Sequence, residues 1–288
     1  MTAEQNDRTK SRVIENSGHE RENDRKSVTA LARGLGVLRC FRAHDGFLTN
    51  QEIAGRTGLP RPTVTRITYT LCELGYLKHT PRLGKYQLAP GIITLGYAAF
   101  ANLGIRHAAR EFMDQAAEAL SAPVGLGVLD RNKALYLDTS RGTTTFTVQL
   151  DIGSRIPLAE TAMGLALLVT LPEDEREAHI KRSADKDPGK LPVLRRTMDR
   201  ALSDYEKYGF VVAMGEWRSD VFSAGAALVA EDGSGTYAFN CGAPPYHFSP
   251  ERLYNEVGPV MASLVRVVDD QLNGRRPFRP EQSWLSTP

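Results

Sequence analysis

Cysteine is scarce in this chain of 288 residues: the three that it has, Cys40, Cys72 and Cys241, lie far apart. They form neither a CxxC pair nor an even set, which excludes a disulfide-stapled scaffold and indicates a reducing compartment. No apolar run approaches the roughly 18 residues that a membrane helix needs. The first 27 residues are polar and lack the apolar core of a signal peptide. The sequence therefore predicts a soluble cytoplasmic protein.

Signatures of several enzyme classes are also missing. There is no GxGxxG and no GxxxxGK, and the histidines never stand three or four residues apart, so no helix presents a metal-binding pair. We expect no metal, no cofactor and no catalytic residue. A nucleophile pair of Cys241 and His247 is the alternative, but a lone cysteine at the end of an apolar strand is more typical of a buried small residue.

The net charge of +2 conceals an uneven distribution. Residues 28–90 carry nine Lys and Arg against three Asp and Glu, whereas the 198 residues that follow carry 21 against 25. A small basic module on a mildly acidic body is typical of a polyanion-binding head attached to a regulatory or catalytic domain. Residues 1–27 are balanced in charge and show no apolar periodicity, so we expect a disordered arm there.

Residues 28–41 have apolar side chains at three- and four-residue steps, which predicts a helix ending near Phe41. A capping box follows, because the Thr49 hydroxyl can accept from the amide of Glu52 while the Glu52 carboxylate accepts from the amide of Thr49. Gly58 is expected to end this second, short helix in the left-handed conformation. Leu48, before the cap, and Ile53, in the first turn of the helix, are expected to pack on each other as a hydrophobic staple.

A third helix is predicted from the Pro60–Pro62 turn to about Leu74, with core-facing side chains at Val64, Ile67, Leu71 and Leu74. Two helices joined by a short turn containing glycine make a helix-turn-helix, whose second helix contacts base edges in the major groove. Arginine can bind guanine through two hydrogen bonds, and threonine offers a hydroxyl or a methyl group. The candidate DNA-contacting residues on this helix are Arg61, Thr63, Thr65, Arg66 and Tyr69.

Two short strands are predicted next, Tyr76–His79 and Lys85–Leu88, around a turn that carries Arg82. Such a hairpin beside a helix-turn-helix is a wing, and it would place Arg82 and Lys85 on the DNA backbone or in the minor groove. The alternative is a small helical interaction domain whose charges only confer solubility.

The stretches ALARGLGVLRCF, LTNQEIAGRTGLPRPTVTRITYTLCELGYL, GKYQLAPGIITLG and GSRIPLAETAMGLALL resemble the IclR-type bacterial transcriptional regulators over about residues 28–272. The resemblance implies an α+β protein with an N-terminal winged helix-turn-helix, a linker helix and a C-terminal GAF-like α/β effector-binding domain. The domain boundaries are then a disordered arm 1–27, a DNA-binding domain 28–90, a linker helix 91–104, an effector-binding domain 105–273 and a flexible tail 274–288.

The pattern of the body fits that resemblance. Strands are expected at Val124–Leu129, Ala134–Asp138, Thr144–Leu150, Phe210–Met214, Ser223–Ala230 and Thr236–Cys241. Helices are expected at Ile92–Leu103, Ile105–Leu120, Thr161–Leu171, Glu173–Arg182, Val193–Tyr208 and Pro250–Leu272. Strand groups flanked by helices indicate a sheet with helices packed on it.

Matching to the family assigns effector contacts to Thr161, Ala162, Met163, Gly164, Phe222, Ala224, Asn240 and Cys241. The sequence departs from the family pattern at Leu165, where a lysine is usual, and at Met163, where a small residue is usual. Trp217 and Arg218 are open to two interpretations: an aromatic wall with a carboxylate clamp, or an exposed loop tip.

The resemblance implies a regulator, which we expect to be a repressor. It would bind a double-stranded DNA operator as a homodimer or homotetramer, and a small organic-acid or aromatic metabolite would modulate that binding. The competing hypothesis is a metabolite-binding or enzymatic body with a basic head that does not read DNA. A DNA-binding architectural protein without an effector is a third possibility.

Overall fold

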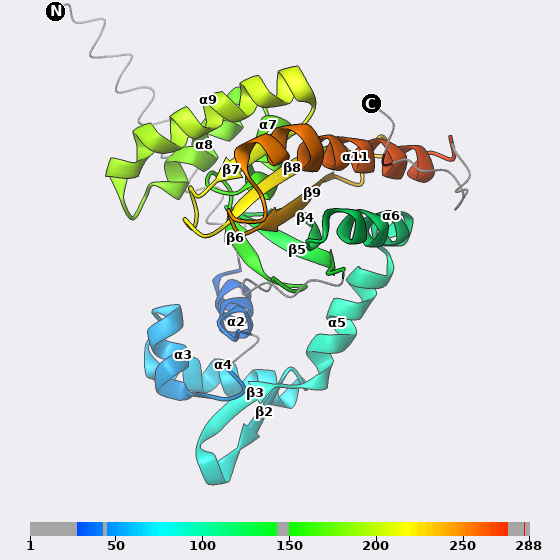
Figure 1. Cartoon of the computed structure of the whole chain (residues 1–288). Coiled ribbons are helices and arrows are strands. Elements are labelled where there is room, and N and C mark those ends of the chain that lie inside the picture. Colours follow the sequence, from blue (N-terminus) through cyan, green and yellow to red (C-terminus); the bar gives the residue numbers. More distant parts are fainter. Residues whose placement is uncertain (1–27, 43–44, 143–149, 276–284, 286–288) are drawn as a thin grey trace, which may run out of the picture. The chain divides into compact units, whose positions relative to one another are not determined.

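The chain divides into two units, Met1–Asn102 and Leu103–Pro288, in a computed structural model that describes residues 28–42, 45–142, 150–275 and 285 (Figure 1). The expected N-terminal arm, residues 1–27, lies outside the described residues, as does most of the tail after Arg275. No described helix is long and apolar enough to cross a lipid bilayer.

The first unit consists of helices and a small antiparallel sheet with strand order β1-β3-β2. A 3-10 turn at Pro81–Leu83 joins β2 to β3. Its elements are α2 (Thr29–Arg39), β1 (Leu48–Thr49), α3 (Asn50–Thr57), α4 (Arg61–Glu73), β2 (Leu77–Thr80), β3 (Lys85–Leu88) and α5 (Pro90–Ala101).

The capping box predicted at α3 is present. The Thr49 hydroxyl accepts from the amide of Glu52 at 3.2 Å, and the Glu52 carboxylate accepts from the amide of Thr49 at 2.7 Å. Gly58 ends the helix at a φ of 69°, a left-handed conformation that glycine adopts without steric cost. Leu48 and Ile53 are buried in one cluster, so the start and the end of α3 form as the sequence predicts.

Two details of the first unit differ from the prediction. The first helix ends at Arg39 rather than near Phe41. Leu74, expected in the core, is 62% exposed, because α4 ends one residue earlier and the chain turns at Gly75. Val64 and Leu71 are buried as predicted and Ile67 packs against the same core, while Thr68 joins the buried stripe.

The second unit is built on a six-stranded antiparallel sheet with strand order β6-β5-β4-β9-β8-β7. Its strands are β4 (Val124–Asp130), β5 (Lys133–Ser140), β6 (Arg155–Pro157), β7 (Val211–Met214), β8 (Phe222–Val229) and β9 (Thr236–Ala243). Its longer helices are α6 (Gly104–Leu120), α7 (Ala162–Val169), α8 (Glu173–Ser183), α9 (Leu191–Tyr208) and α11 (Gly258–Leu272).

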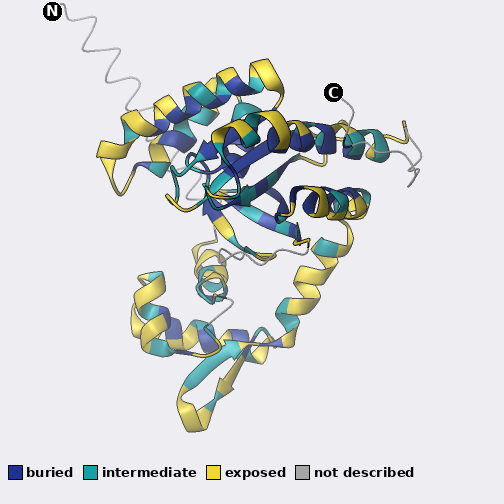
Figure 2. Cartoon of the chain, viewed as in Figure 1, coloured by how far each residue is buried: buried dark blue, intermediate teal, exposed yellow. Residues whose placement is uncertain are grey.

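Helices cover both faces of this sheet. On one face α6 and α11 pack on each other and on the central strands, and on the other α7 and α9 pack on the sheet with α8 against α9. Each face therefore has its own hydrophobic cluster, and the strands between them are buried (Figure 2). Strands covered on both sides lack a regular alternation of apolar and polar residues.

The predicted strands and helices of the body are found with ends shifted by a few residues, with three exceptions. The strand β6 was not predicted. The strand expected at Thr144–Leu150 lies outside the described residues except for Leu150. The C-terminal helix expected at Pro250–Leu272 is interrupted by a π turn at Leu253–Val257. Pro259 has no N–H to donate to the carbonyl of Asn255, which explains why regular α-helical bonding fails at this point.

Candidate functional site

The outer face of α4 is the first candidate site. Arg61, Thr65, Arg66 and Tyr69 are exposed on it, Tyr69 to 67%, while Thr63 is half-buried. The opposite side of the helix packs in the core of the unit. Two arginines and a tyrosine on an exposed helix of a basic unit form a surface suited to base edges and phosphates.

Thr65 has a second role inside the motif. Its hydroxyl donates to the carbonyl of Arg61 at 3.0 Å and accepts from Nδ2 of Asn50, the first residue of α3, at 2.7 Å. These bonds connect the two helices of the motif. Thr65 therefore helps to fix the angle at which α4 is presented.

The loop that precedes α3 is held by an ion pair. Arg56 donates to both carboxylate oxygens of Asp45, at 2.5 and 2.9 Å, and to the carbonyl of Cys40 at 3.0 Å. The guanidinium lowers the pKa of Asp45 to about 2. Arg56 thus supports the loop structurally.

The hairpin of β2 and β3 forms the predicted wing. Arg82 is exposed at its tip, and Lys85 is half-buried at the start of β3. Gly84 has a φ of 60°, which allows the tight turn between the strands. The rings of His79 and Tyr86 stack across the strands with their centroids 4.7 Å apart, which stiffens the hairpin.

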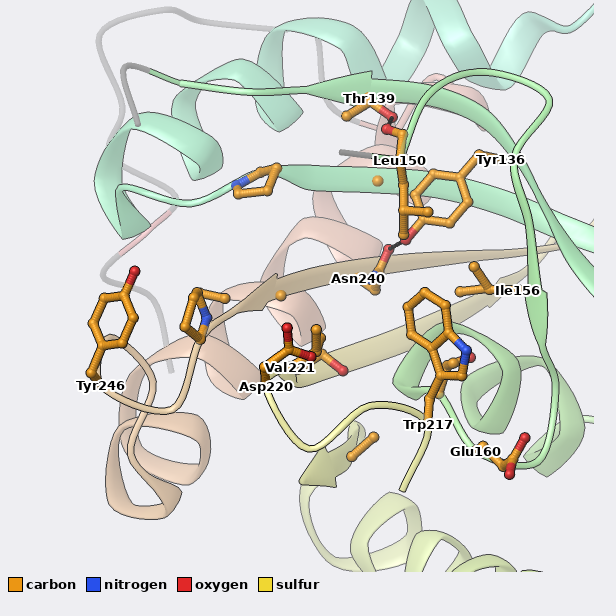
Figure 3. A pocket seen from close by; sticks show the side chains of 18 residues that line it. Tyr136, Thr139, Leu150, Ile156, Glu160, Trp217, Asp220, Val221, Asn240 and Tyr246 are labelled. Atoms are coloured by element: carbon orange, nitrogen blue, oxygen red, sulfur yellow. Dashed lines mark hydrogen bonds between the residues drawn. The ribbon is translucent and has the colours of Figure 1, made fainter. Parts of the chain in front are cut away.

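A cavity of about 220 Å³ is the second candidate site, and it lies on the α7 side of the sheet in the second unit. Its walls come from all six strands of the sheet, from the segment before α7, and from the loops that follow β7 and β9 (Figure 3). Leu150, Ile156, Val221 and Trp217 supply apolar surface, and the ring of Tyr136 adds to it. A small concave pocket with apolar walls and few polar groups is typical of a small-molecule site.

Strand parity decides which residues reach this cavity. Ser223 on β8 and Asn240 on β9 line it. Their neighbours Ala224 and Cys241 point to the other face and are buried in the cluster beneath α6 and α11. Successive residues of a strand face opposite sides, so neighbours in sequence belong to different cores.

Tyr136 and Asn240 form a buried polar pair in the cavity wall. The Tyr136 hydroxyl donates to Oδ1 of Asn240 at 3.1 Å, and burial raises the pKa of the phenol. Gly125 on β4 makes room for both: a Cβ there would lie 2.4 Å from the Tyr136 ring and 2.7 Å from Asn240 Oδ1. Glycine at 125 is therefore what lets this pair reach the cavity.

The loop between β7 and β8 closes one side of the cavity. Glu216 anchors it by accepting from Arg200 and from the amide of Met214, both at 2.5 Å. Trp217 lines the cavity, whereas Arg218 is exposed and pairs with Asp220 at 2.7 Å. Trp217 is therefore placed as an aromatic wall of the cavity. Arg218 is not a lining residue, so the structure gives no support to a carboxylate clamp at this position.

The residues that family matching assigned to the effector divide between wall and core. Thr161 and Asn240 line the cavity. Ala162, Met163 and Gly164 are buried in the first turn of α7 and lie outside its lining, as do Phe222, Ala224 and Cys241 on the strands. The matching missed Tyr136, Glu160, Asp220 and Ser223. Ser223 is the single hydroxyl residue of the apolar strand FSAGAALV, and this pattern could have indicated a polar group facing a ligand.

Cys241 and His247 do not have the setting of a nucleophile and its base. Burial raises the pKa of the Cys241 thiol, which keeps it protonated at neutral pH. The His247 ring lies 3.1 Å from the carbonyl of Leu120 and 3.3 Å from Arg252. Among the described residues, no cluster of three or more His, Cys, Asp or Glu side chains is placed to hold a metal ion.

A winged helix-turn-helix joined to a ligand-sized cavity in an α/β unit defines the class of transcriptional regulators that carry a separate effector domain. The comparisons agree: the IclR helix-turn-helix domain matches residues 30–81, and the bacterial transcriptional regulator IclR C-terminal domain matches residues 97–268. The chain belongs to the IclR family of bacterial transcriptional regulators.

Individual relatives match most of the chain. It is 30% identical to the HTH-type transcriptional regulator TsaQ1/TsaQ2 of Comamonas testosteroni, over 87% of this chain and 90% of that protein. The crystal structure of an IclR family regulator from Brucella abortus is 43% identical with a TM-score of 0.77, covering 86% of this chain and 94% of that one. An IclR homologue from Microbacterium hydrocarbonoxydans complexed with 4-hydroxybenzoate shares the fold at 20% identity, with a TM-score of 0.67 and coverage of 85% and 99%.

Proposed function

We propose that this protein is a cytoplasmic repressor that binds a specific operator through α4 and the wing, and that releases or retains it according to a metabolite in the cavity. The observation that carries the proposal is the exposed row Arg61, Arg66 and Tyr69 on α4. The basic charge of the surrounding 63 residues supplies the attraction to phosphates. For the enzymatic alternative, the described residues of the cavity offer no group that supports catalysis as the exposed residues of α4 support DNA binding.

The metabolite would be an organic acid or an aromatic compound, and the walls of the cavity favour the aromatic class. An effector can shift operator binding only if it binds the DNA-competent and incompetent arrangements with different affinity. The wall of the cavity includes the loop between β7 and β8, which carries Trp217.

The operator experiment is a salt titration of the purified full chain with its own upstream DNA, with random DNA as competitor. We expect affinity to fall steeply with salt and to exceed that for random DNA by a factor of roughly 10³ or more. Equally weak binding to both DNAs, with and without a pool of cell metabolites, would contradict the proposal and favour a head that does not read sequence.

Assembly into a homodimer or homotetramer completes the proposal. Helix α5 has apolar residues on all sides, yet none of its residues is buried, and Ile93 and Tyr97 are 72% and 70% exposed. A helix that is apolar all round is normally covered. We propose that a second copy of the chain covers α5, which would also give the operator-binding unit the two-fold symmetry of a palindromic site.

Replacing Ile93 by glutamate should weaken this assembly by about tenfold, because the charge would be desolvated in the interface. Sedimentation at a series of protein concentrations measures the dissociation constant. Arg196→Glu on the exposed side of α9 is the control. Unchanged sedimentation of Ile93→Glu would place the interface elsewhere.

A further inference from the structure

The size of the cavity limits its ligand. An apolar protein cavity of about 150 Å³ accepts benzene, and this one has about 220 Å³. That space suits one aromatic ring with a small substituent. The half-buried indole of Trp217, with Ile156 and Val221 nearby, offers a surface on which such a ring packs (Figure 3).

The polar groups that remain available in the cavity are uncharged. Asn240 uses Oδ1 to accept from Tyr136, and its Nδ2 has no partner among the described residues. The hydroxyl of Ser223 likewise has no partner in that part of the chain. The hydroxyl of Thr161 is already engaged, because it donates to the carbonyl of Pro157 and accepts from the amide of Gly164. The amide N–H groups of Asn240 and the hydroxyl of Ser223 therefore remain for a ligand, beside the indole N–H of Trp217 and the hydroxyl of Tyr246, whose residues also line the cavity.

The charges that do line the cavity are negative. They are the carboxylates of Glu160 and Asp220, and their cationic partners Lys190 and Arg218 are not part of the described lining. No Lys, Arg or His is found among the described lining residues. Both carboxylates are already paired, so a ligand carboxylate would lose hydration here and gain no counter-ion from the described lining residues.

The start of α7 does not replace the missing cation. Helix N-termini bind anions through the free amides of their first turn. Here Ala162, Met163 and Gly164 do not line the cavity, and the amides of Gly164 and Leu165 already donate to Thr161. The first turn of α7 packs into the core instead of facing the ligand space.

From these observations we propose that the cavity selects an uncharged, monocyclic aromatic compound with a hydroxyl or amide group, and rejects the aromatic acid of the same shape. Trp217 packs on the ring, and Asn240 and Ser223 bind the polar group. The proposal rests on the proposed function, since it names the class of effector that the regulator responds to. The proposal is based on the absence of a cationic side chain among the described lining residues of this chain.

The test compares 4-hydroxybenzamide with 4-hydroxybenzoate, because the two differ little in shape and differ in charge at neutral pH. Binding to the full chain is followed by tryptophan fluorescence in a Trp284→Phe background, which leaves Trp217 as the remaining indole. We expect the amide to bind at least about tenfold more tightly than the carboxylate. Tighter binding of the carboxylate overturns the proposal, and so does failure of the amide and of 4-hydroxybenzyl alcohol to bind at millimolar concentration.

Variants separate the contributions of the wall. Ser223→Ala and Asn240→Ala should each weaken the amide severalfold, with Asn273→Ala at the end of α11 as the control. Asp220→Asn should strengthen binding of the carboxylate more than binding of the amide, because it removes a negative charge from the wall. If the affinities of all three variants for the amide and for the carboxylate equal those of the parent protein, the assignment of the wall residues is contradicted. Melting temperatures of the unliganded variants show whether each one folds.

Operator binding measured on the same preparations distinguishes this proposal from the function on which it rests. Specific operator binding together with a preference for the carboxylate leaves the regulator intact and overturns the ligand class. A preference for the amide in a protein that does not discriminate between operator and random DNA supports the ligand class and overturns the regulator.

Discussion

Replacement of Arg66 by alanine is expected to weaken specific operator binding by about 1–3 kcal/mol, roughly five- to 150-fold. Arg66 lies on the exposed face of α4, and the core-facing side of that helix is occupied by other residues. Loss of its guanidinium would remove the proposed bidentate contact to a base while leaving the fold unchanged. Electrophoretic mobility shift or fluorescence anisotropy with operator and random DNA measures the effect.

The control for this prediction is Arg33→Ala. Arg33 is also exposed in the first unit, but it lies on α2, so the variant loses the same charge away from the proposed recognition face. We expect it to lower the affinity for both DNAs slightly and to keep the ratio between them. Equal loss of that ratio in both variants would show that the effect is general electrostatics and that α4 does not read the bases.

Replacement of Gly164 by alanine is expected to destabilise the second unit by about 3 kcal/mol. The added Cβ would lie 2.2 Å from the carbonyl oxygen and 2.4 Å from the Cα of Leu158. These are backbone atoms, so the clash cannot be relieved by rotating a side chain, and α7 would have to move away from the segment that precedes it. Urea denaturation followed by circular dichroism measures the free energy of unfolding.

Gly104→Ala is the matched control, because Gly104 begins α6 in the same unit and an added Cβ would meet nothing within 4 Å. We expect its free energy of unfolding to stay within about 0.5 kcal/mol of the parent protein. The comparison also bears on function: Gly164 was assigned to the effector by family matching, and the structure instead gives it a packing role. Equal stability of the two variants would contradict that role.

The sequence was sufficient for the winged helix-turn-helix, because the signals that define it are local. The capping box of Thr49 and Glu52 and the left-handed Gly58 involve atoms within a few residues of one another. The prediction failed at Leu74, where burial depends on how far α4 extends before the chain turns. The family, and with it the order of the two domains, also followed from linear motifs.

The cavity was largely out of reach of the sequence, although Thr161 and Asn240 were among the predicted contacts and line it. Its wall is assembled from segments between Pro123 and Tyr246 that are distant in the chain. Helices cover both faces of the sheet, so the strands are apolar on each side and their sequence does not tell which side holds the ligand space.

The amino-acid sequence by itself therefore determined the helix-turn-helix, the wing and the family, because caps, turns and helical periodicity act over short distances along the chain. The tertiary structure decided which neighbours in sequence separate: Ser223 and Asn240 face the cavity, while Ala224 and Cys241 enter the opposite core. It also brought Glu160 and Asp220 to the lining of the cavity and left their cations outside that lining. Burial and charge in the cavity depend on packing across the sheet, which short-range patterns do not encode.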